Sequence, residues 1–340
     1  MKLTIKDIAR LSGVSPTTVS KVINSKDDDI GEATKQRVKE VIEQHGYTPN
    51  IVARSLVTKK TNTIGIVIPD IRNPFFPELI RGAEDTAHDL GYNLIICNTD
   101  DDPDKEKIYL DILKKKMVDG IIFTASSSQS FHQTNGFDMP TVVVDRDIKT
   151  RNIIGRIIVD NIKGGYLAAE HLIERGCKKI GFISGVRTSL PSLERYIGYK
   201  RALENNGFMD YEKLCRFKSF KSEFGYTAAK ELLEYHPDID GFFCASDLIA
   251  IGAMQAAVEK GKSIPRDIKI VGFDDIYISQ YLNPQLTTIR QPIYQIGERA
   301  AKMLISSLKS KRQNSDEENF EVLDTELIIR KSSYRIFDKD

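Results

Sequence analysis

The residues best suited to chemistry in this sequence are polar and aromatic side chains that follow predicted strands. Asp145 and Arg146 end one predicted strand, Asp274 ends another, and Asn73 follows a third, just before an aromatic pair. Carboxylates, guanidinium groups and amides can donate to and accept from the hydroxyls of a polyol, and aromatic faces can cover its C–H bonds. These residue types therefore favour binding of a hydroxylated ligand.

Signals of catalysis are mostly absent from the sequence. It contains no G-x-x-x-x-G-K-[ST] loop, no G-x-G-x-x-G after a strand and no G-x-S-x-G. Its histidines lack metal-ligand spacing, and the aspartate runs 27–29 and 100–102 fit solvated loops better than metal sites. We therefore expect no enzyme activity, no metal and no cofactor.

The composition is that of an ordinary soluble globular protein. The chain has 340 residues, of which 41% are hydrophobic and 29% charged, enough for about two or three domains. No apolar run approaches the roughly 18 residues of a membrane span. The N-terminus becomes charged before a signal-peptide core could form, and the four cysteines lie far apart. We expect a cytoplasmic protein without a membrane partner.

Charge is distributed unevenly along the chain. Residues 1–60 hold 11 Lys and Arg against 7 Asp and Glu, whereas the other 280 residues hold 38 against 41. A basic head on a mildly acidic body suggests a module that binds a polyanion.

The first 48 residues predict three short helices, over 5–11, 16–24 and 32–45. Ser15 is a natural N-cap, Pro16 fits the first helical position, and Gly46 fits a left-handed stop. A helix, a turn at Gly13 and a capped second helix have helix-turn-helix geometry. Lys21 on the second helix can donate to guanine O6 and N7. An arbitrary three-helix bundle with a polar face is the alternative.

After residue 62 the pattern changes to apolar runs that alternate with amphipathic helices. Such alternation predicts right-handed βαβ units and parallel sheets covered by helices, here in two similar halves that begin near Thr63 and Lys179. The expected strands are 64–69, 93–97, 120–124, 141–145, 179–184, 241–245, 268–272 and a late strand at 322–329. The expected helices are 77–90, 104–116, 163–175, 194–206, 223–235, 247–260 and 292–309.

Residues 4–24, TIKDIARLSGVSPTTVSKVIN, resemble the signature of the lactose/galactose repressor family of bacterial transcriptional regulators. The resemblance continues through 46–50, 53–56, 63–66 and 73–76 and covers the chain up to Ile329. Lys21 stands where the family usually has Arg, and Gly31 where it usually has a Ser cap.

The resemblance implies an α/β fold with an N-terminal helix-turn-helix head and a hinge helix, joined to a two-lobed body like periplasmic binding proteins. The implied domains are 1–48, 49–61 and 62–333, with lobes of 62–160 plus 291–320 and 162–289 plus 321–333. In the family the hinge helix forms in the DNA minor groove, where Leu56 would wedge between base pairs. An ordinary linker is the alternative. The expected DNA-binding residues are Thr4, Ser15, Pro16, Thr17, Thr18, Ser20, Lys21, Asn24, Asn50, Ala53, Arg54 and Leu56.

The implied cleft lies at the carboxyl ends of the strands, and its residues resemble the sugar contacts of ribose-binding proteins. Thr124 and Ser246 depart from asparagines at their positions. The expected effector-binding residues are Asn73, Phe75, Phe76, Thr124, Asp145, Arg146, Asn161, Arg195, Phe220, Ser246, Asp274 and Gln291.

The sequence thus predicts a homodimeric repressor that binds operator DNA and a small sugar, with a pentose such as ribose as the leading candidate. One alternative is a catabolite-control regulator whose co-repressor is a phosphorylated carrier protein docked on the first lobe. There the partner would strengthen DNA binding. A periplasmic-type solute-binding protein is disfavoured by the helix-turn-helix head.

Overall fold

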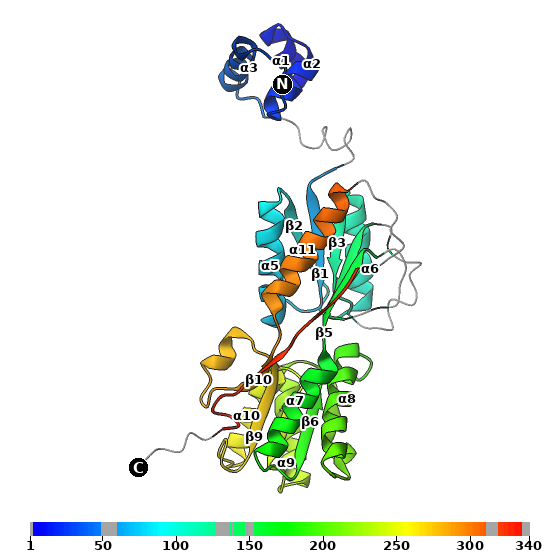
Figure 1. The fold of residues 1–340 in the computed structure, drawn as a ribbon, viewed down its shortest axis with the longest axis vertical. Coiled ribbons are helices and arrows are strands. Elements are labelled where there is room, and N and C mark those ends of the chain that lie inside the picture. The colour runs from blue at the N-terminus through cyan, green and yellow to red at the C-terminus, as the bar shows by residue number, and fades with distance from the viewer. Residues whose placement is uncertain are drawn as a thin grey trace. The chain divides into compact units, whose positions relative to one another are not determined.

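The structure is a computed structural model that describes residues 3–48, 60–126, 137, 139–146, 148, 153–310 and 319–334. The chain divides into two compact units, Met1–Thr61 and Asn62–Asp340 (Figure 1). Within the described residues, no helix has the length and apolar character needed to cross a bilayer.

The N-terminal unit is a three-helix head, with α1 at Ile5–Ser12, α2 at Pro16–Ile23 and α3 at Glu32–Gln44. Ser15 Oγ accepts from the Thr18 backbone N–H at 3.1 Å, which confirms the predicted cap of α2. Gly13 (φ +64°) and Gly46 (φ +55°) take the left-handed conformation that glycine adopts without a Cβ penalty. The helices enclose a small core formed by Ile8, Ala9, Val19, Val22 and Val38.

The first lobe of the body is a six-stranded parallel sheet in the order β11-β5-β4-β3-β1-β2. Helices α5 and α11 share one apolar cluster with the sheet, and α6 contributes to a separate cluster with β1, β3 and β4. The elements are β1 Thr63–Ile68, α5 Phe75–Asp89, β2 Asn93–Asn98, α6 Pro103–Lys115, β3 Gly120–Phe123, β4 Thr141–Val144, β5 Gly155–Val159, α11 Ile293–Lys309 and β11 Asn319–Leu323.

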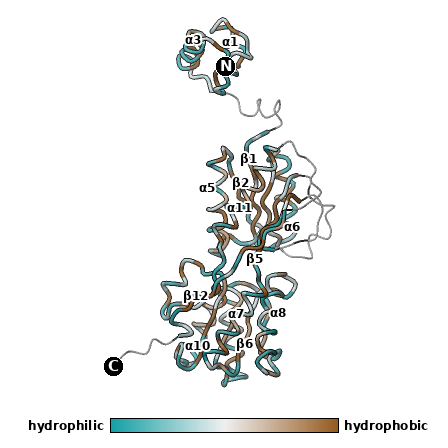
Figure 2. The backbone as a smooth tube through the Cα atoms, viewed as in Figure 1, coloured by the Kyte–Doolittle hydropathy of each residue, from teal (hydrophilic) through white to brown (hydrophobic). Residues whose placement is uncertain are grey.

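The second lobe repeats this plan with the strand order β12-β10-β9-β8-β6-β7, in which only β12 runs antiparallel to its neighbour. Figure 2 shows hydrophobic residues concentrated along the strands, as two-sided burial requires. The elements are α7 Asn161–Glu174, β6 Ile180–Ser184, α8 Leu190–Asn205, η2 Tyr211–Leu214, β7 Cys215–Phe217, α9 Ser222–Tyr235, β8 Gly241–Cys244, α10 Asp247–Glu259, β9 Lys269–Asp274, η3 Tyr277–Gln280, β10 Thr287–Arg290 and β12 Glu326–Ile328.

The chain crosses between the lobes three times, after β5, β10 and β11. The single late strand expected at 322–329 is in fact two strands, because β11 pairs with β5 and β12 pairs with β10. The expected lobe boundary between 320 and 321 therefore falls inside β11. Sequence reasoning also missed β5, β7 and β10, each of five residues or fewer.

Candidate functional site

The N-terminal head presents α2 as its candidate DNA-reading helix. Thr17 is exposed, and Ser20 lies half-buried on the same helix. Lys21 Nζ forms an ion pair with the exposed carboxylate of Asp29, so this cation stays at the surface. Asn24 Nδ2 donates to the Ser20 carbonyl at 2.7 Å at the end of the helix. A short polar surface of this kind, next to a helix N-terminus, suits phosphates and base edges.

Two of the expected DNA-binding side chains are engaged in helix capping. Ser15 caps α2, and Thr4 Oγ1 donates to Asp7 Oδ2 at 2.7 Å at the start of α1. The expected hinge residues Asn50, Ala53, Arg54 and Leu56 lie outside the described residues. Their DNA contacts stay predictions.

We expect Leu56→Ala to weaken specific operator binding by about 1–3 kcal/mol and to leave nonspecific binding nearly unchanged, because a wedge supports only the kinked complex. Gel-shift titrations on operator and scrambled DNA at one salt concentration measure both affinities. Equal losses on the two DNAs would contradict a minor-groove wedge.

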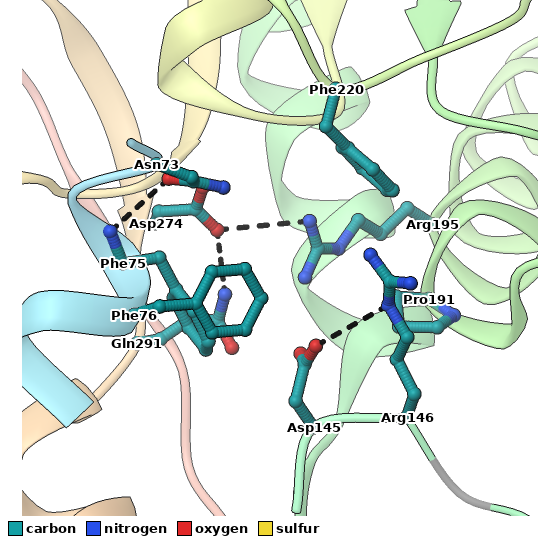
Figure 3. A pocket seen from close by; sticks show the side chains of 10 residues that line it. All are labelled: Asn73, Phe75, Phe76, Asp145, Arg146, Pro191, Arg195, Phe220, Asp274 and Gln291. Carbon is teal, nitrogen blue, oxygen red and sulfur yellow. Dashed lines mark hydrogen bonds and ion pairs between the residues drawn. The ribbon is translucent and has the colours of Figure 1, made fainter. Parts of the chain in front are cut away.

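The body contains a pocket between the two lobes, at the carboxyl ends of the parallel strands (Figure 3). Residues from both lobes line it. Asp145 and Gln291 directly follow β4 and β10, Asp274 is the last residue of β9, and Asn73 lies in the segment after β1. The lining residues are Asn73, Phe75, Phe76, Asp145, Arg146, Pro191, Arg195, Phe220, Asp274 and Gln291. The pocket thus brings together nine side chains that the sequence singled out as effector contacts.

Three expected effector contacts do not line this pocket. Asn161 lies behind it, where its Oδ1 accepts from Arg195 Nε at 2.9 Å. Ser246 Oγ accepts from the Ile249 N–H at 3.3 Å and caps α10. Thr124 is fully buried. Asn161 therefore orients a pocket residue, whereas Ser246 serves the local backbone.

Pro191 lines the pocket although sequence reasoning did not single it out. It occupies the first turn of α8, four residues before Arg195. Residues four apart share a helix face. Once Arg195 was placed on a helix and in the pocket, this spacing could have predicted Pro191 as a second lining residue.

Arg195 and Asp274 form the charged centre on the second-lobe side. Arg195 Nη1 lies 3.7 Å from Asp274 Oδ1 and donates to the Ala245 carbonyl at 2.7 Å. Gln291 Nε2 also donates to Asp274 Oδ1, at 2.7 Å. Burial raises the pKa of Asp274 well above its usual value and lowers the pKa of Arg195, and each partner's charge opposes these shifts.

Asp145 and Arg146 supply the charges on the first-lobe side. Arg146 Nε lies 3.8 Å from Asp145 Oδ2. Burial raises the pKa of the Asp145 carboxyl, opposed by the charges of Arg146 and Arg195. The four charged groups of the pocket are thus two acids and two guanidinium groups, which gives no excess of positive charge.

Both aspartates hold backbone conformations that L-residues rarely adopt. The φ angles are +63° at Asp145 and +116° at Asp274. Such angles cost about 1–3 kcal/mol each and persist where surrounding structure imposes them, often at ligand sites. For Asp274, the adjacent network includes Asp247, whose Oδ2 accepts from the Ile276 N–H at 2.9 Å and the Ser279 hydroxyl at 2.6 Å.

In the part of the chain that the structure describes, no group of three or more His, Cys, Asp or Glu side chains is placed to hold a metal ion.

A helix-turn-helix head on a two-lobed body with a polar interlobe pocket defines the class of ligand-responsive DNA-binding regulators. Residues 4–50 match the family model "Bacterial regulatory proteins, lacI family". Residues 61–329 match "Periplasmic binding proteins and sugar binding domain of LacI family". The chain belongs to the LacI family of bacterial regulatory proteins. The predicted family and fold class are confirmed.

Two curated relatives match nearly the whole chain. The HTH-type transcriptional regulator RegA of Clostridium saccharobutylicum is 42% identical over 336 residues, covering 98% of this chain and 100% of that protein. The ribose operon repressor of Halalkalibacterium halodurans is 39% identical over 330 residues, covering 97% of each chain.

Solved structures show the same fold. A LacI family regulator from Enterococcus faecium with bound ribose is 31% identical, with a TM-score of 0.71 over 79% of this chain and 98% of that one. The lac repressor dimer bound to operator and the anti-inducer ONPF is 23% identical, with a TM-score of 0.85 over 98% and 100%.

Proposed function

We propose that this LacI-family protein is a homodimeric repressor whose operator affinity is controlled by a small uncharged sugar, with ribose as the leading candidate. The observation that carries the proposal is the charge balance of the pocket, in which Asp145 and Asp274 face Arg146 and Arg195. Each guanidinium group already has an acid group beside it and is less available to a phosphate group, whereas the hydroxyls of a neutral sugar can bond to both acids and guanidinium groups. The protein would act in the cytoplasm, where its operator lies.

The pocket also suits a sugar in the side chains that line it. Phe75, Phe76 and Phe220 can cover the C–H faces of a ring (Figure 3). Gln291 Oε1 has no hydrogen-bond partner within the described residues, so it is ready to accept from a hydroxyl. The ribose-named relative and the ribose-bound structure point to the same ligand class.

The regulatory mechanism follows from linkage. A sugar that binds best to a conformation of the body that is unfavourable for operator binding must lower operator affinity. By linkage, the operator lowers sugar affinity by the same factor. We propose that the sugar acts as an inducer in this way.

Calorimetry with D-ribose and with ribose 5-phosphate tests the ligand. We expect D-ribose to bind more tightly than the phosphate ester and to release labelled operator in a gel shift. Preference for the ester, or no binding of any free pentose or hexose, would contradict the proposal.

The alternative co-repressor, a phosphorylated carrier protein, would need a cationic surface on the first lobe. A surface groove beside α11 holds two cations, Arg299 and Lys302, and two acids, Glu298 and Glu321. Arg299 is paired with Glu321 at 2.9 Å. The acids of the groove offset the charge of its cations, so the groove offers a phosphate no clear excess of positive charge. We therefore favour a sugar over a phosphorylated carrier protein as the effector. A carrier protein that strengthens operator binding while free sugars have no effect would reverse this preference.

Exposed apolar residues on the body support a dimer. Tyr277 and Tyr281 are 74% and 64% exposed and lie with ring centroids 5.0 Å apart, next to Ile278. On the first lobe, Ile71 and Ile96 are also exposed. We call these five residues the dimer surface. Exposed apolar side chains that lie together, as Tyr277 and Tyr281 do, mark association sites.

We expect light scattering to report a dimer and not a tetramer, because residues 307–340 lack the leucine heptads of a tetramerising coiled coil. Tyr281→Asp should raise the dimer dissociation constant at least about tenfold, since a charge would be buried without a partner. Tyr235→Asp, at an equally exposed tyrosine on α9, is the control. A stable tetramer, or equal effects of both variants, would contradict this surface.

A further inference from the structure

Arg146 is anchored in the first lobe by one end of its guanidinium group. Its Nη1 donates to Asp101 Oδ1 at 2.8 Å and to the carbonyls of Ala125 and Ser126 at 3.0 and 2.6 Å. The guanidinium carbon lies 5.8 Å from the ring centroid of Phe220, which belongs to the second lobe. Arg146 therefore lines the pocket and lies near both lobes, and Asp101 is one of the three groups that hold it in the first lobe.

Asp101 belongs to a turn with an unfavourable backbone conformation. Asp100 and Asp101 are consecutive non-glycine residues with φ angles of +56° and +60°, a region that L-residues occupy at a cost. The Asp101 N–H donates to the Pro69 carbonyl at 2.9 Å, and Asp102 then caps α6. The bond from Arg146 to Asp101 is one of the contacts that hold this turn.

The same turn continues β2, the edge strand of the first sheet. Asn98, the last residue of β2, accepts from the Ile71 N–H at 2.7 Å and donates to Asp100 Oδ1 at 2.7 Å. Ile71 and Ile96 belong to the dimer surface defined above. A connected set of contacts therefore runs from Arg146 in the pocket, through Asp101 and its turn, to the first-lobe part of that surface.

From this connection, and resting on the sugar response proposed above, we propose that Asp101 is a positioning residue that couples the Arg146 guanidinium to the edge of the first lobe. A sugar that bonds to Arg146 shifts the guanidinium relative to Asp101. The strained turn then changes, and with it the surface on which the second chain rests. Coupling between the pocket and the edge of the lobe needs a structural element whose conformation both sites influence. The turn at residues 98–102 is that element.

Asp100 provides a matched control for Asp101. It lies in the same turn with nearly the same φ angle, but its carboxylate pairs with Lys105 and accepts from Asn98 rather than from Arg146. Asparagine keeps the size of aspartate and tolerates left-handed backbone. Asp100→Asn keeps an amide oxygen that can still accept from Asn98 and loses only the ion pair with Lys105, whereas Asp101→Asn loses the charge opposite Arg146.

The test compares the full-length wild type with both variants. Without sugar, we expect amide hydrogen exchange in β2 and the following turn to be at least fivefold faster in Asp101→Asn and within twofold of wild type in Asp100→Asn. With D-ribose, the ratio of operator dissociation constants with and without sugar should fall at least fivefold in Asp101→Asn. Its ribose dissociation constant should change less than threefold, and Asp101→Glu should restore part of the response.

Unchanged exchange in Asp101→Asn, equal acceleration in both variants, or a full ribose response in Asp101→Asn would overturn the role of Asp101. A wild type that ignores ribose would contradict the proposed function instead. The exchange measurement needs no sugar, so it decides the positioning role in either case.

Discussion

Asp274→Asn should lower the affinity of the protein for D-ribose by roughly 30- to 1,000-fold, or about 2–4 kcal/mol, and leave operator binding without sugar intact. The Asp274 carboxylate is buried beside Arg195 and Gln291, so it can accept from sugar hydroxyls in a site shielded from water. Hydrogen bonds to a charged group contribute about 1.5–3 kcal/mol each, and partners left unpaired add to the loss. The variant should be a repressor that no longer responds to sugar.

Asparagine is the better replacement here because Asp274 has a φ of +116°. Alanine would add backbone strain, whereas asparagine tolerates positive φ and keeps the shape of the side chain. Asp238→Asn, which removes an exposed carboxylate paired with Lys179 on the surface, is the control. Calorimetry and gel shifts measure the two affinities. Ribose binding as tight as in wild type would exclude Asp274 as a sugar contact.

Acidification from pH 7 to 4.5 should destabilise the body by about 2–3 kcal/mol through His171 alone. This side chain is buried, and its Nε2 lies 2.7 Å from Ser333 Oγ in the C-terminal segment. Burial lowers the pKa of His171 to about 4, from an ordinary value of 6.5. Between these values the unfolded chain binds a proton that the folded chain does not, so stability is lost as the pH falls.

Asp247 titrates in the opposite sense, because burial raises its pKa to about 7 and the folded state then binds the extra proton. The contribution of His171 must therefore be obtained as a difference between proteins. We expect urea unfolding of His171→Gln to lose about 2–3 kcal/mol less stability between pH 7 and 4.5 than wild type and the exposed-site control His88→Gln. The same pH slope in all three proteins would mean that His171 is not held neutral.

The sequence alone determined the elements of the fold, because the signals that form them are local. Ser15 and Pro16 predicted the start of α2 from a hydroxyl that can reach an N–H three residues on. Apolar runs bounded by turn residues predicted most of the buried strands. Such signals fail for short strands such as β10, which has four residues and one exposed end.

Only the tertiary structure decided which sheet the last strands join. Two residues separate β11 from β12, yet β11 pairs with β5 and β12 with β10. Strand pairing depends on partners that lie more than a hundred residues away in the case of β5. The sequence of the segment itself therefore does not predict which sheet each strand joins.

The candidate pocket shows the same division. A residue's place at the end of a parallel strand follows from the sequence, which is why Asp145, Arg146 and Asp274 were found. Whether its side chain faces the pocket depends on the groups packed around it. Asn161 is turned toward Arg195, and Ser246 is drawn into a helix cap. Asp101 looked like part of a solvated acidic loop, and only the fold brought Arg146 within hydrogen-bonding distance of it, because direction and proximity of side chains are properties of the packed molecule.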